Sequence, residues 1–217
     1  MSANNAGRVG VWGRSGSGKS SYIKQRIAKA RRVVIFDPLD EYEAEGFKAV
    51  RGNLDAVRVA MRDNWRGFRI AYVPPTGREP RALSALGNLL IAAQEPARKK
   101  GGGPGITLVV EEMNLSFPVH GGATKAPGFA HICSRGRHYG IEVIGASQRI
   151  AEVSTRFRGN CTETVVLAQK GPRDLEAAAA ELGCDKARVS ALANLDYLQE
   201  KAGQITAGQV KIPKKRM

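Results

Sequence analysis

Short apolar runs alternate with amphipathic stretches along the chain. The apolar runs, bounded by turn residues, predict buried strands at 8–12, 32–36, 68–73, 106–112, 141–147 and 162–169. Between them, apolar residues spaced three or four positions apart predict helices at 19–31, 55–64, 80–94, 128–140 and 172–183. Strands that alternate with helices are typical of βαβ units. The pattern therefore predicts an α/β fold with a mainly parallel sheet and helices on both faces.

Proline and glycine mark where several of these elements end. Pro74 and Pro75 stop the third strand, Gly140 stops the fourth helix, and the segment 98–105, RKKGGGPG, predicts a flexible basic turn. No internal repeat or long linker divides the chain. We therefore expect a single domain over 1–217, with a core at about 8–170 and a C-terminal helical segment and basic tail over 171–217.

The charge balance adds a class of partner to this picture. The 217 residues include 34 Lys and Arg against 20 Asp and Glu, a net charge of +14, which favours binding to a polyanion. The three cysteines are far apart and form no C-x-x-C pair, so we expect core thiols rather than zinc ligands or disulfides. We expect neither a signal peptide nor a transmembrane segment, because no apolar run approaches the roughly 20 residues that span a bilayer.

Residues 13–20, GRSGSGKS, match the phosphate-loop pattern G-x-x-x-x-G-K-[ST] between a predicted strand and a predicted helix. Glycines let backbone N–H groups curl around a phosphate, and the following helix directs the positive end of its dipole at the same anion. A lysine contacts the terminal phosphates, and a Ser hydroxyl binds Mg²⁺. The predicted ATP-binding residues are Gly13, Ser15, Gly16, Ser17, Gly18, Lys19, Ser20 and Ser21, with Ser20 also a metal ligand. The alternative is a simple Ser/Gly turn.

Two acids follow the apolar run ITLVV and supply the second candidate group. The carboxyl edge of an open α/β sheet is where ligands bind, so this strand would deliver Glu111 and Glu112 to the nucleotide. We expect Glu111 to hold Mg²⁺ through water and Glu112 to orient or deprotonate the attacking water. Such strands usually carry Asp at the first position, so the longer Glu111 leaves open how the two roles are shared. The alternative is a pair of solvated acids.

Three further segments extend the phosphate-loop pattern. They are VVIFDPLDEY at 33–42, SRGRHYGIEVIGASQR at 134–149 and VSTRFRGNC at 153–161. In order and spacing, over about 8–170, the chain resembles the FtsK–HerA superfamily of DNA-pumping ATPases, which are P-loop NTPases of the RecA/ASCE type. Because added domains and a membrane segment are absent, it most resembles the genome-packaging ATPases of tailless, internal-membrane viruses.

The resemblance implies roles for residues outside the phosphate loop. Gln148 would be the polar sensor that reaches the γ-phosphate, and Asp37 would lie near the nucleotide, together with Glu41. Arg135 or Arg137 would be a finger inserted into the site of a neighbouring subunit, and Arg137 fits the G-R-x-x-G spacing better. A finger acting in trans implies a homo-oligomeric ring, a hexamer by resemblance. The family's other partners would be double-stranded DNA and capsid-vertex or portal-complex proteins, in a virion or host cytoplasm.

Basic loops are the candidates for contact with DNA. We expect phosphate contacts without base readout, because no helix-turn-helix or zinc-finger pattern is present. The candidates are Lys99, Lys100, Arg156 and Arg158, together with Lys211, Lys214, Lys215 and Arg216 of the tail. For each of these clusters an ordinary solvated surface is the alternative.

The sequence leaves three other functions open. The same ATPase domain could belong to a Zot-like or conjugative motor that extrudes DNA. A P-loop kinase for a small molecule would also need a phosphate loop, although no arginine-rich lid is evident in the sequence. A nucleotide-gated binding module would bind ATP without hydrolysing it.

Overall fold

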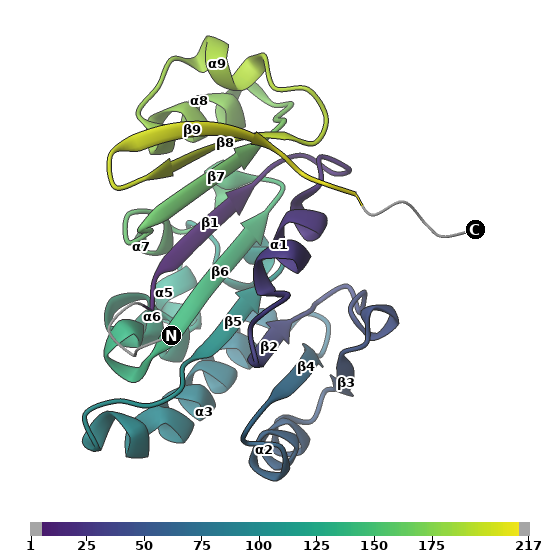
Figure 1. Cartoon of the computed structure of the whole chain (residues 1–217), viewed down its shortest axis with the longest axis vertical. Helices are drawn as coiled ribbons and strands as arrows, with labels where there is room; N and C mark the ends of the chain where they lie inside the picture. Colours follow the sequence, from purple (N-terminus) through teal and green to yellow (C-terminus); the bar gives the residue numbers. More distant parts are fainter. Residues whose placement is uncertain (1–5, 213–217) are drawn as a thin grey trace.

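The computed structural model describes residues 6–212, which form one sheet flanked by helices (Figure 1). Within these residues the sheet has nine strands in the order β3-β4-β2-β5-β6-β1-β7-β8-β9. The strands are β1 (Arg8–Trp12), β2 (Arg32–Phe36), β3 (Lys48–Arg51), β4 (Phe68–Val73), β5 (Ile106–Val110), β6 (Ile141–Ser147), β7 (Glu163–Leu167), β8 (Asp196–Lys201) and β9 (Gln204–Gln209). Strands β1 to β7 pair in parallel, whereas β8 runs antiparallel to both β7 and β9.

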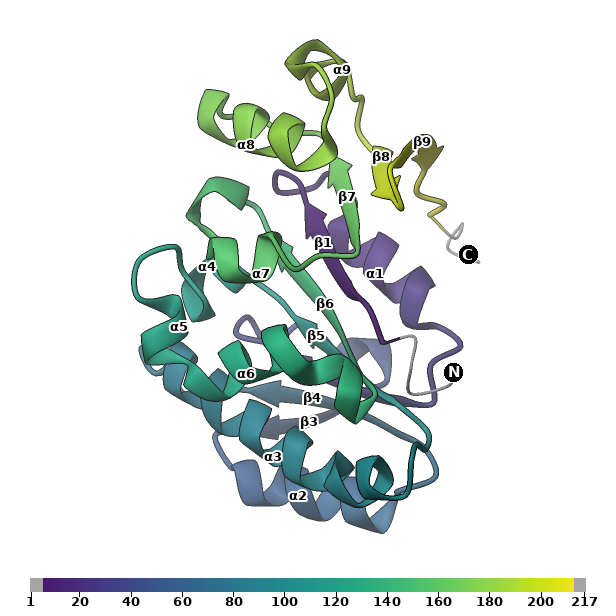
Figure 2. The same cartoon turned by 90° about the vertical axis from the view of Figure 1, so that its left-hand side faces the viewer.

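Helices cover both faces of the sheet unequally. The longer ones are α1 (Lys19–Ile27), α2 (Leu54–Asp63), α3 (Glu79–Lys99), α6 (Pro127–Arg135) and α8 (Pro172–Leu182). The short ones are α4 (Met113–Ser116), α5 (Gly122–Lys125), α7 (Thr155–Arg158) and α9 (Lys186–Ser190), with 3₁₀ turns η2 (Glu43–Glu45), η3 (Gly136–Tyr139) and η4 (Ile150–Glu152). Helix α1 lies on one face, and α2, α3, α6 and α8 lie on the other (Figure 2). The predicted α/β fold with a mainly parallel sheet is confirmed.

The central strands are buried on both sides because each face of the sheet packs against helices. All residues of β1, β2 and β5 are buried. On the α1 face, Ile23 and Ile27 pack with side chains of these strands, and on the other face Leu83, Leu86 and Leu90 of α3 do the same. Two apolar cores therefore hold the sheet between its layers of helices. Among residues 6–212, no helix combines the length and apolarity needed to cross a bilayer.

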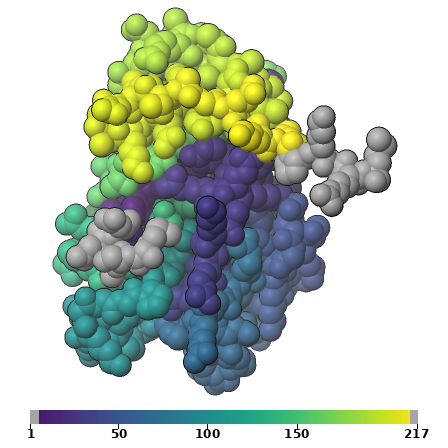
Figure 3. Space-filling view, viewed as in Figure 1, coloured from purple at the N-terminus to yellow at the C-terminus, as the bar shows by residue number. Residues whose placement is uncertain are grey.

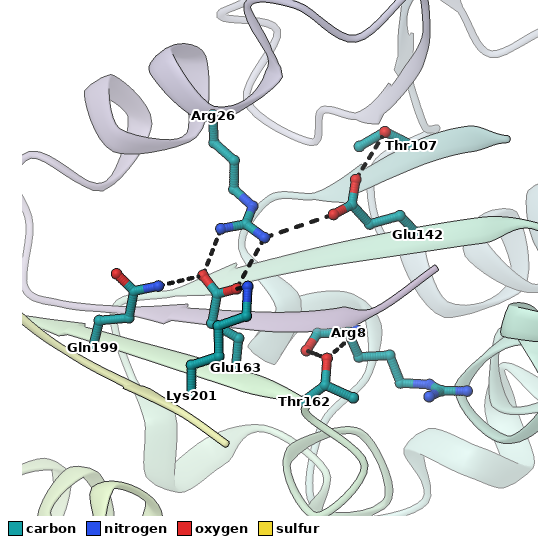
Figure 4. Close-up of polar contacts among 8 residues, drawn as sticks. All are labelled: Arg8, Arg26, Thr107, Glu142, Thr162, Glu163, Gln199 and Lys201. Atoms are coloured by element: carbon teal, nitrogen blue, oxygen red, sulfur yellow. Dashed lines mark hydrogen bonds and ion pairs between the residues drawn. The ribbon is translucent and has the colours of Figure 1, made fainter. Parts of the chain in front are cut away.

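An ion-pair cluster around the buried Glu163 fixes the last turn of α1 to the sheet (Figure 4). The carboxylate of Glu163 accepts hydrogen bonds from Arg26, at 3.1 Å from Nη2, and from Gln199, at 3.0 Å. Lys201 Nζ lies 3.3 Å from the same carboxylate, and Arg26 also faces Glu142 at 3.7 Å. Strands β6, β7 and β8 thus share one charged contact with α1.

Several boundaries differ from those expected. Strand β5 ends at Val110, so both glutamates follow the strand instead of ending it. Helix α1 ends at Ile27, whereas the predicted helix continued to residue 31. The residues after Ile27 no longer show apolar positions at helical spacing. Helix α3 continues through Pro96 to Lys99, so the basic turn begins later than predicted. Pro96 has no N–H and therefore removes one i→i−4 hydrogen bond, but the helix continues for only three residues beyond it.

The expected helix over 128–140 is divided in two. Helix α6 ends at Arg135 and a 3₁₀ turn, η3, continues to Tyr139. Gly140 follows with φ of 66°, the left-handed conformation that glycine adopts most readily, so the predicted stop is confirmed.

Three strands were not predicted at all. Strand β3 is a short, exposed edge strand, and β8 and β9 alternate weakly between polar and apolar residues. The segment 171–217 therefore adds a hairpin to the sheet besides its helices. Val210, in the segment predicted to be a basic tail, is buried, while Lys214, Lys215 and Arg216 lie outside the described residues.

Candidate functional site

The predicted site residues meet at the carboxyl edge of the parallel strands. The phosphate loop follows β1, Asp37 follows β2, the two glutamates follow β5, and Gln148 follows β6. These four strands are neighbours in the order β2-β5-β6-β1. Parallel pairing brings their ends to one edge, which is the ligand-binding edge of this fold class. The structure therefore brings together residues separated by up to 135 positions in the sequence.

The phosphate loop is anchored between the ends of two strands. The Arg14 N–H donates to the carbonyl of Ala168, after β7, at 2.8 Å, and the Gly13 N–H donates to the carbonyl of Ser147 at 3.3 Å. Gly16 and Gly18 have φ of 72° and 103°, which side-chain-bearing residues rarely adopt. Gly18 is the N-cap of α1 and offers no side chain to the helix amides. The loop thus leaves backbone donors at a helix N-terminus free for an anion.

The side chains of the loop fit a polyphosphate. The Ser17 hydroxyl is buried and has no hydrogen-bond partner among the described residues. Lys19 is 8% exposed, and its Nζ donates across the loop to the carbonyl of Arg14 at 3.3 Å. Burial lowers the pKa of Lys19, and the nearby Glu112 and Glu111 partly oppose that shift. A bound triphosphate would take up these unpaired donors and the lysine charge.

Glu111 is a buried acid under the loop. Its carboxylate accepts a hydrogen bond from the hydroxyl of Tyr42. Burial raises the pKa of Glu111 to about 7, and Glu112 and Asp37 add to the rise, while Tyr42 and Lys19 counteract it. A carboxyl group in this range is sensitive to any charge that arrives beside it.

Glu112 is linked directly to the predicted sensor. It is half-buried, and its carboxylate accepts a hydrogen bond from Gln148 Nε2 at 2.8 Å. Its φ of 43° is left-handed, a conformation that costs a non-glycine residue on the order of 1 kcal/mol. The backbone holds this strain at the position predicted to orient water, which directs Glu112 away from the path of the strand.

Asp37 organises the loop that follows β2. Its carboxylate accepts the backbone N–H groups of Glu41 and Tyr42 at 2.8 Å and 3.0 Å. Burial raises its pKa, and these two hydrogen bonds lower it. Its contact with nucleotide stays a prediction, whereas its contact with this loop is direct. Glu41 itself is exposed.

The sequence reasoning missed Tyr42 and Asp174. Tyr42 is the last residue of the segment DPLDEY. An aromatic residue with a hydroxyl, directly after two acids, was the sequence signal that could have marked it as a site residue. Asp174, 2% exposed, accepts from Arg149 Nε at 2.8 Å and from the Ala151 N–H at 3.2 Å, so it ties the segment after Gln148 to α8. No local sequence signal marks this partner, because 25 positions separate the two residues of the pair.

The two candidate arginine fingers lie at the opposite edge of the sheet. Arg135 ends α6 and Arg137 lies in η3, just before β6 begins, and both are exposed. The seven residues of β6 separate them from Gln148 by roughly 20 Å. Neither arginine can therefore act on the phosphate loop of its own chain.

The predicted DNA-contacting residues are scattered. Lys99 and Lys100, at the end of α3, are exposed at the amino edge of the sheet. Arg156 is exposed on α7. Arg158 instead donates to Glu181 at 2.7 Å and to the carbonyl of Val153 at 3.1 Å. The structure does not bring these four residues together.

The oxygen groups at the carboxyl edge suit Mg²⁺. Ser20, at the start of α1, and Glu111 would hold it, and the ion would supply charge neutralisation for the phosphates. The described residues contain no group of three or more His, Cys, Asp or Glu side chains placed to bind a metal. Mg²⁺ in nucleotide sites keeps several waters and takes few protein ligands, so nucleotide and water would complete its coordination.

Comparison with known proteins finds likeness at the level of structure. No family model and no curated protein sequence match the chain. The genome-packaging NTPase B204 from Sulfolobus turreted icosahedral virus 2, in complex with ATP-γS, has a TM-score of 0.75 at 17% identity and covers 96% of this chain and 100% of that one. VirB4 of Thermoanaerobacter pseudethanolicus gives 0.72 at 13%, over 95% and 90%. The pCW3 conjugation coupling protein TcpA gives 0.61 at 14%, over 95% and 60%.

A mainly parallel sheet with a phosphate loop between β1 and α1 is the architecture of a P-loop NTPase. At these identities the shared property is the fold, and it extends over nearly the whole of this chain. The viral packaging NTPase, VirB4 and the conjugation coupling protein all share this architecture, which is the fold that the resemblance to FtsK–HerA ATPases implies.

Proposed function

We propose that this chain is an ATP-driven motor that moves double-stranded DNA and packages a viral genome into a preformed capsid. The observation that carries the ATPase function is the preassembled site at the carboxyl edge. Glu111 and Glu112 both raise the pKa of the buried Lys19 there, and Gln148 is already hydrogen-bonded to Glu112. Such a site can grip a triphosphate, position water and report loss of the terminal phosphate to the segment held by Asp174.

Genome packaging is supported by the extent of the likeness. The B204 packaging NTPase and this chain cover each other almost completely, so the two have comparable size and the same elements. The net charge of +14 suits a partner rich in phosphate. Capsid-vertex or portal-complex proteins would then dock the motor to the shell.

A ring of identical subunits would complete the site. Arg137 and Arg135 are exposed at the amino edge, and they lie too far from their own phosphate loop to contact its nucleotide. In a head-to-tail ring, the amino-edge arginine of one copy can face the carboxyl-edge site of the next. A hexamer is the ring size that the sequence resemblance favours.

The test is steady-state ATP turnover with and without duplex DNA over a salt series. We expect DNA to stimulate turnover and the stimulation to fall steeply with salt, because binding releases counterions from DNA. Glu112→Gln is the matched variant: it should bind ATP but not hydrolyse it. Turnover that ignores DNA and responds to a nucleoside would instead support a small-molecule kinase.

A DNA-extruding motor for conjugation or phage assembly is the second candidate. The likeness to VirB4, with a TM-score of 0.72, and to the conjugation coupling protein TcpA, with 0.61, supports it. Both motors predict DNA-stimulated turnover. Binding to purified capsid vertices, as opposed to a membrane-bound secretion complex, distinguishes them.

A further inference from the structure

Three chain segments meet beside the phosphate loop on the side away from the acids. In the strand order, β6 and β5 flank β1 on one side, and β7, β8 and β9 flank it on the other. Strands β7 and β9 end at the carboxyl edge, and β8, which is antiparallel, begins there. The residues just after β7, just before β8 and just after β9 therefore lie at the same edge as the phosphate loop.

Two apolar side chains from these segments touch the start of α1. The Leu195 N–H donates to the carbonyl of Ser17 at 3.3 Å, and the Val210 N–H donates to the carbonyl of Leu195 at 2.8 Å. A Cβ atom built on Gly18 would lie 2.9 Å from Leu195 Cδ2 and 3.6 Å from Val210 Cγ2. In Figure 3 the yellow C-terminal segment adjoins the purple N-terminal one directly. The residues that flank the hairpin β8–β9 are thus in direct contact with the phosphate loop.

The backbone at Leu195 is held in an unusual conformation. Its φ is 73°, in the left-handed region that leucine rarely adopts. This conformation lets one residue donate to the phosphate loop, accept from Val210 and still direct its side chain toward Gly18. Strain of this kind persists where the surrounding structure fixes it, and it is concentrated at ligand sites.

A polar side chain beside these residues has no partner. The Gln169 Nε2 and Oε1 atoms are buried and make no hydrogen bond within the described chain. Gln169 directly follows Ala168, whose carbonyl accepts from the Arg14 N–H, and Leu167 Cδ2 lies 3.5 Å from the same Gly18 Cβ position that Leu195 approaches, so Gln169 lies at the same end of β7 as these residues. Buried amide groups are nearly always satisfied, and this one offers a donor and an acceptor together.

The position of the acids sets the direction of a bound nucleotide, a step that rests on the proposed ATPase function. The reacting terminal phosphate must face Glu111 and Glu112, on the β5–β6 side of the loop. The nucleoside must then extend to the opposite side, toward β7, β8 and β9. Leu195, Val210 and Gln169 lie on that side.

We propose that these three residues form the nucleobase site of the ATPase. Leu195, which the buried Val210 holds in place, packs against the face of the base, and the Gln169 carboxamide hydrogen-bonds its donor–acceptor edge, as Gln does with adenine in nucleic acids. The hairpin that the sequence reasoning missed then has a direct role, because it completes the nucleotide site.

The test compares the affinities for Mg-ATP and for inorganic triphosphate, each measured by calorimetry on the full chain. Leu195→Gly removes the side chain and accepts φ of 73° without strain, and Gln169→Leu keeps the size of the side chain without its hydrogen bonds. We expect ATP to bind about tenfold more weakly to Leu195→Gly and about fivefold more weakly to Gln169→Leu. Triphosphate affinity should stay unchanged, because that ligand has no base.

Matched controls lie at the far end of the same hairpin. Ala202→Gly relieves a φ of 51° in the turn between β8 and β9, and Gln204→Leu changes an exposed amide there. Both should bind ATP like the unaltered chain. Unchanged ATP affinity in both site variants, or an equal loss for ATP and triphosphate, would overturn the nucleobase site. Failure of the unaltered chain to bind either ligand would instead contradict the ATPase function.

Discussion

Helix α1 carries a buried or half-buried cation at each end, and the two ends are built differently. Lys19 opens the helix, where the backbone dipole is positive and disfavours a cation, and the first turn contains no acid to offset it. Arg26 lies in the last turn, where the dipole is negative and favours a cation. One end of the helix thus stabilises its charge through the fold, and the other requires an anion.

The surroundings of the two cations repeat this difference. Glu163 is 2% exposed and accepts from Arg26 and Gln199 and faces Lys201, so its charge is matched (Figure 4). Glu111 is also buried, but its one hydrogen-bond donor among the described residues is the neutral Tyr42, and its pKa rises to about 7. A completed charge network holds the fold together, whereas an incomplete one marks where a ligand binds.

The largest effect is expected from removing Lys19, the cation at the start of α1. Lys19→Ala should lower ATP turnover by a factor on the order of 10²–10³, because the terminal phosphates lose a cation placed for them. Stability should change little or increase, since an unfavourable charge leaves the helix N-terminus. Steady-state turnover and urea unfolding measure the two effects. Turnover within about tenfold of the unaltered chain would contradict the assignment of Lys19.

Removal of Arg26, the cation in the last turn of α1, should instead lower stability and leave ATP binding unchanged. Arg26→Ala leaves Glu163 buried with less compensation, so the free energy of unfolding should fall by about 3 kcal/mol. ATP affinity should stay the same. Lys24→Ala is the matched control: its ion pair with Glu45 is exposed, and its loss should cost less than about 1 kcal/mol. Equal losses of unfolding free energy in the two variants would mean that the network in Figure 4 stabilises the fold no more than an exposed ion pair does.

The third prediction uses the pH dependence of Glu111. Its pKa is raised from 4.5 to about 7 on folding, so the folded chain binds the proton more tightly. Stability of the metal-free chain should therefore fall as pH rises from about 4.5 to 7, by at most on the order of 3 kcal/mol.

Glu111→Gln keeps the hydrogen bond from Tyr42 and removes the titration. It should flatten this slope and make the chain about 1–3 kcal/mol more stable at pH 8. Thermal unfolding between pH 5 and pH 8 measures both. Glu176→Gln, an exposed control, should leave the slope in place. A slope that persists in Glu111→Gln would assign it to other groups.

Much of the site could be predicted from the sequence because its information is local. The glycines, Lys19 and Ser20 occupy one loop, and Glu111 and Glu112 follow one apolar strand, so short-range patterns place them at the right edge. The strands β1, β2, β4 and β6 were placed correctly because strands that are largely buried on both faces are rich in apolar residues.

What the sequence could not give depends on contacts across the fold. Strands β8 and β9 have few apolar residues, and they exist because β7 offers them an edge to pair with. The contacts of Leu195 with Ser17 and of Arg149 with Asp174 join distant segments. No periodicity in the chain encodes such pairs.

The smallest expected effect sharpens the difference between the two buried glutamates. Tyr42→Phe removes the hydroxyl that favours the ionised form of Glu111, so the pKa of Glu111 should rise further. If turnover needs the ionised carboxylate, the acid limb of its pH profile should move up by about half a unit to one unit. The plateau of turnover at high pH should stay within about twofold, because Tyr42 acts through Glu111.

Tyr139→Phe, in η3 at the opposite edge, is the matched control and should leave the profile in place. A uniform loss of turnover at every pH in Tyr42→Phe would show that the hydroxyl only supports packing. A shift of the acid limb alone would show that the loop held by Asp37 tunes the acid next to the phosphates. Glu163 is paired with Arg26 and Lys201, and so the two ends of one helix divide stability and chemistry between them.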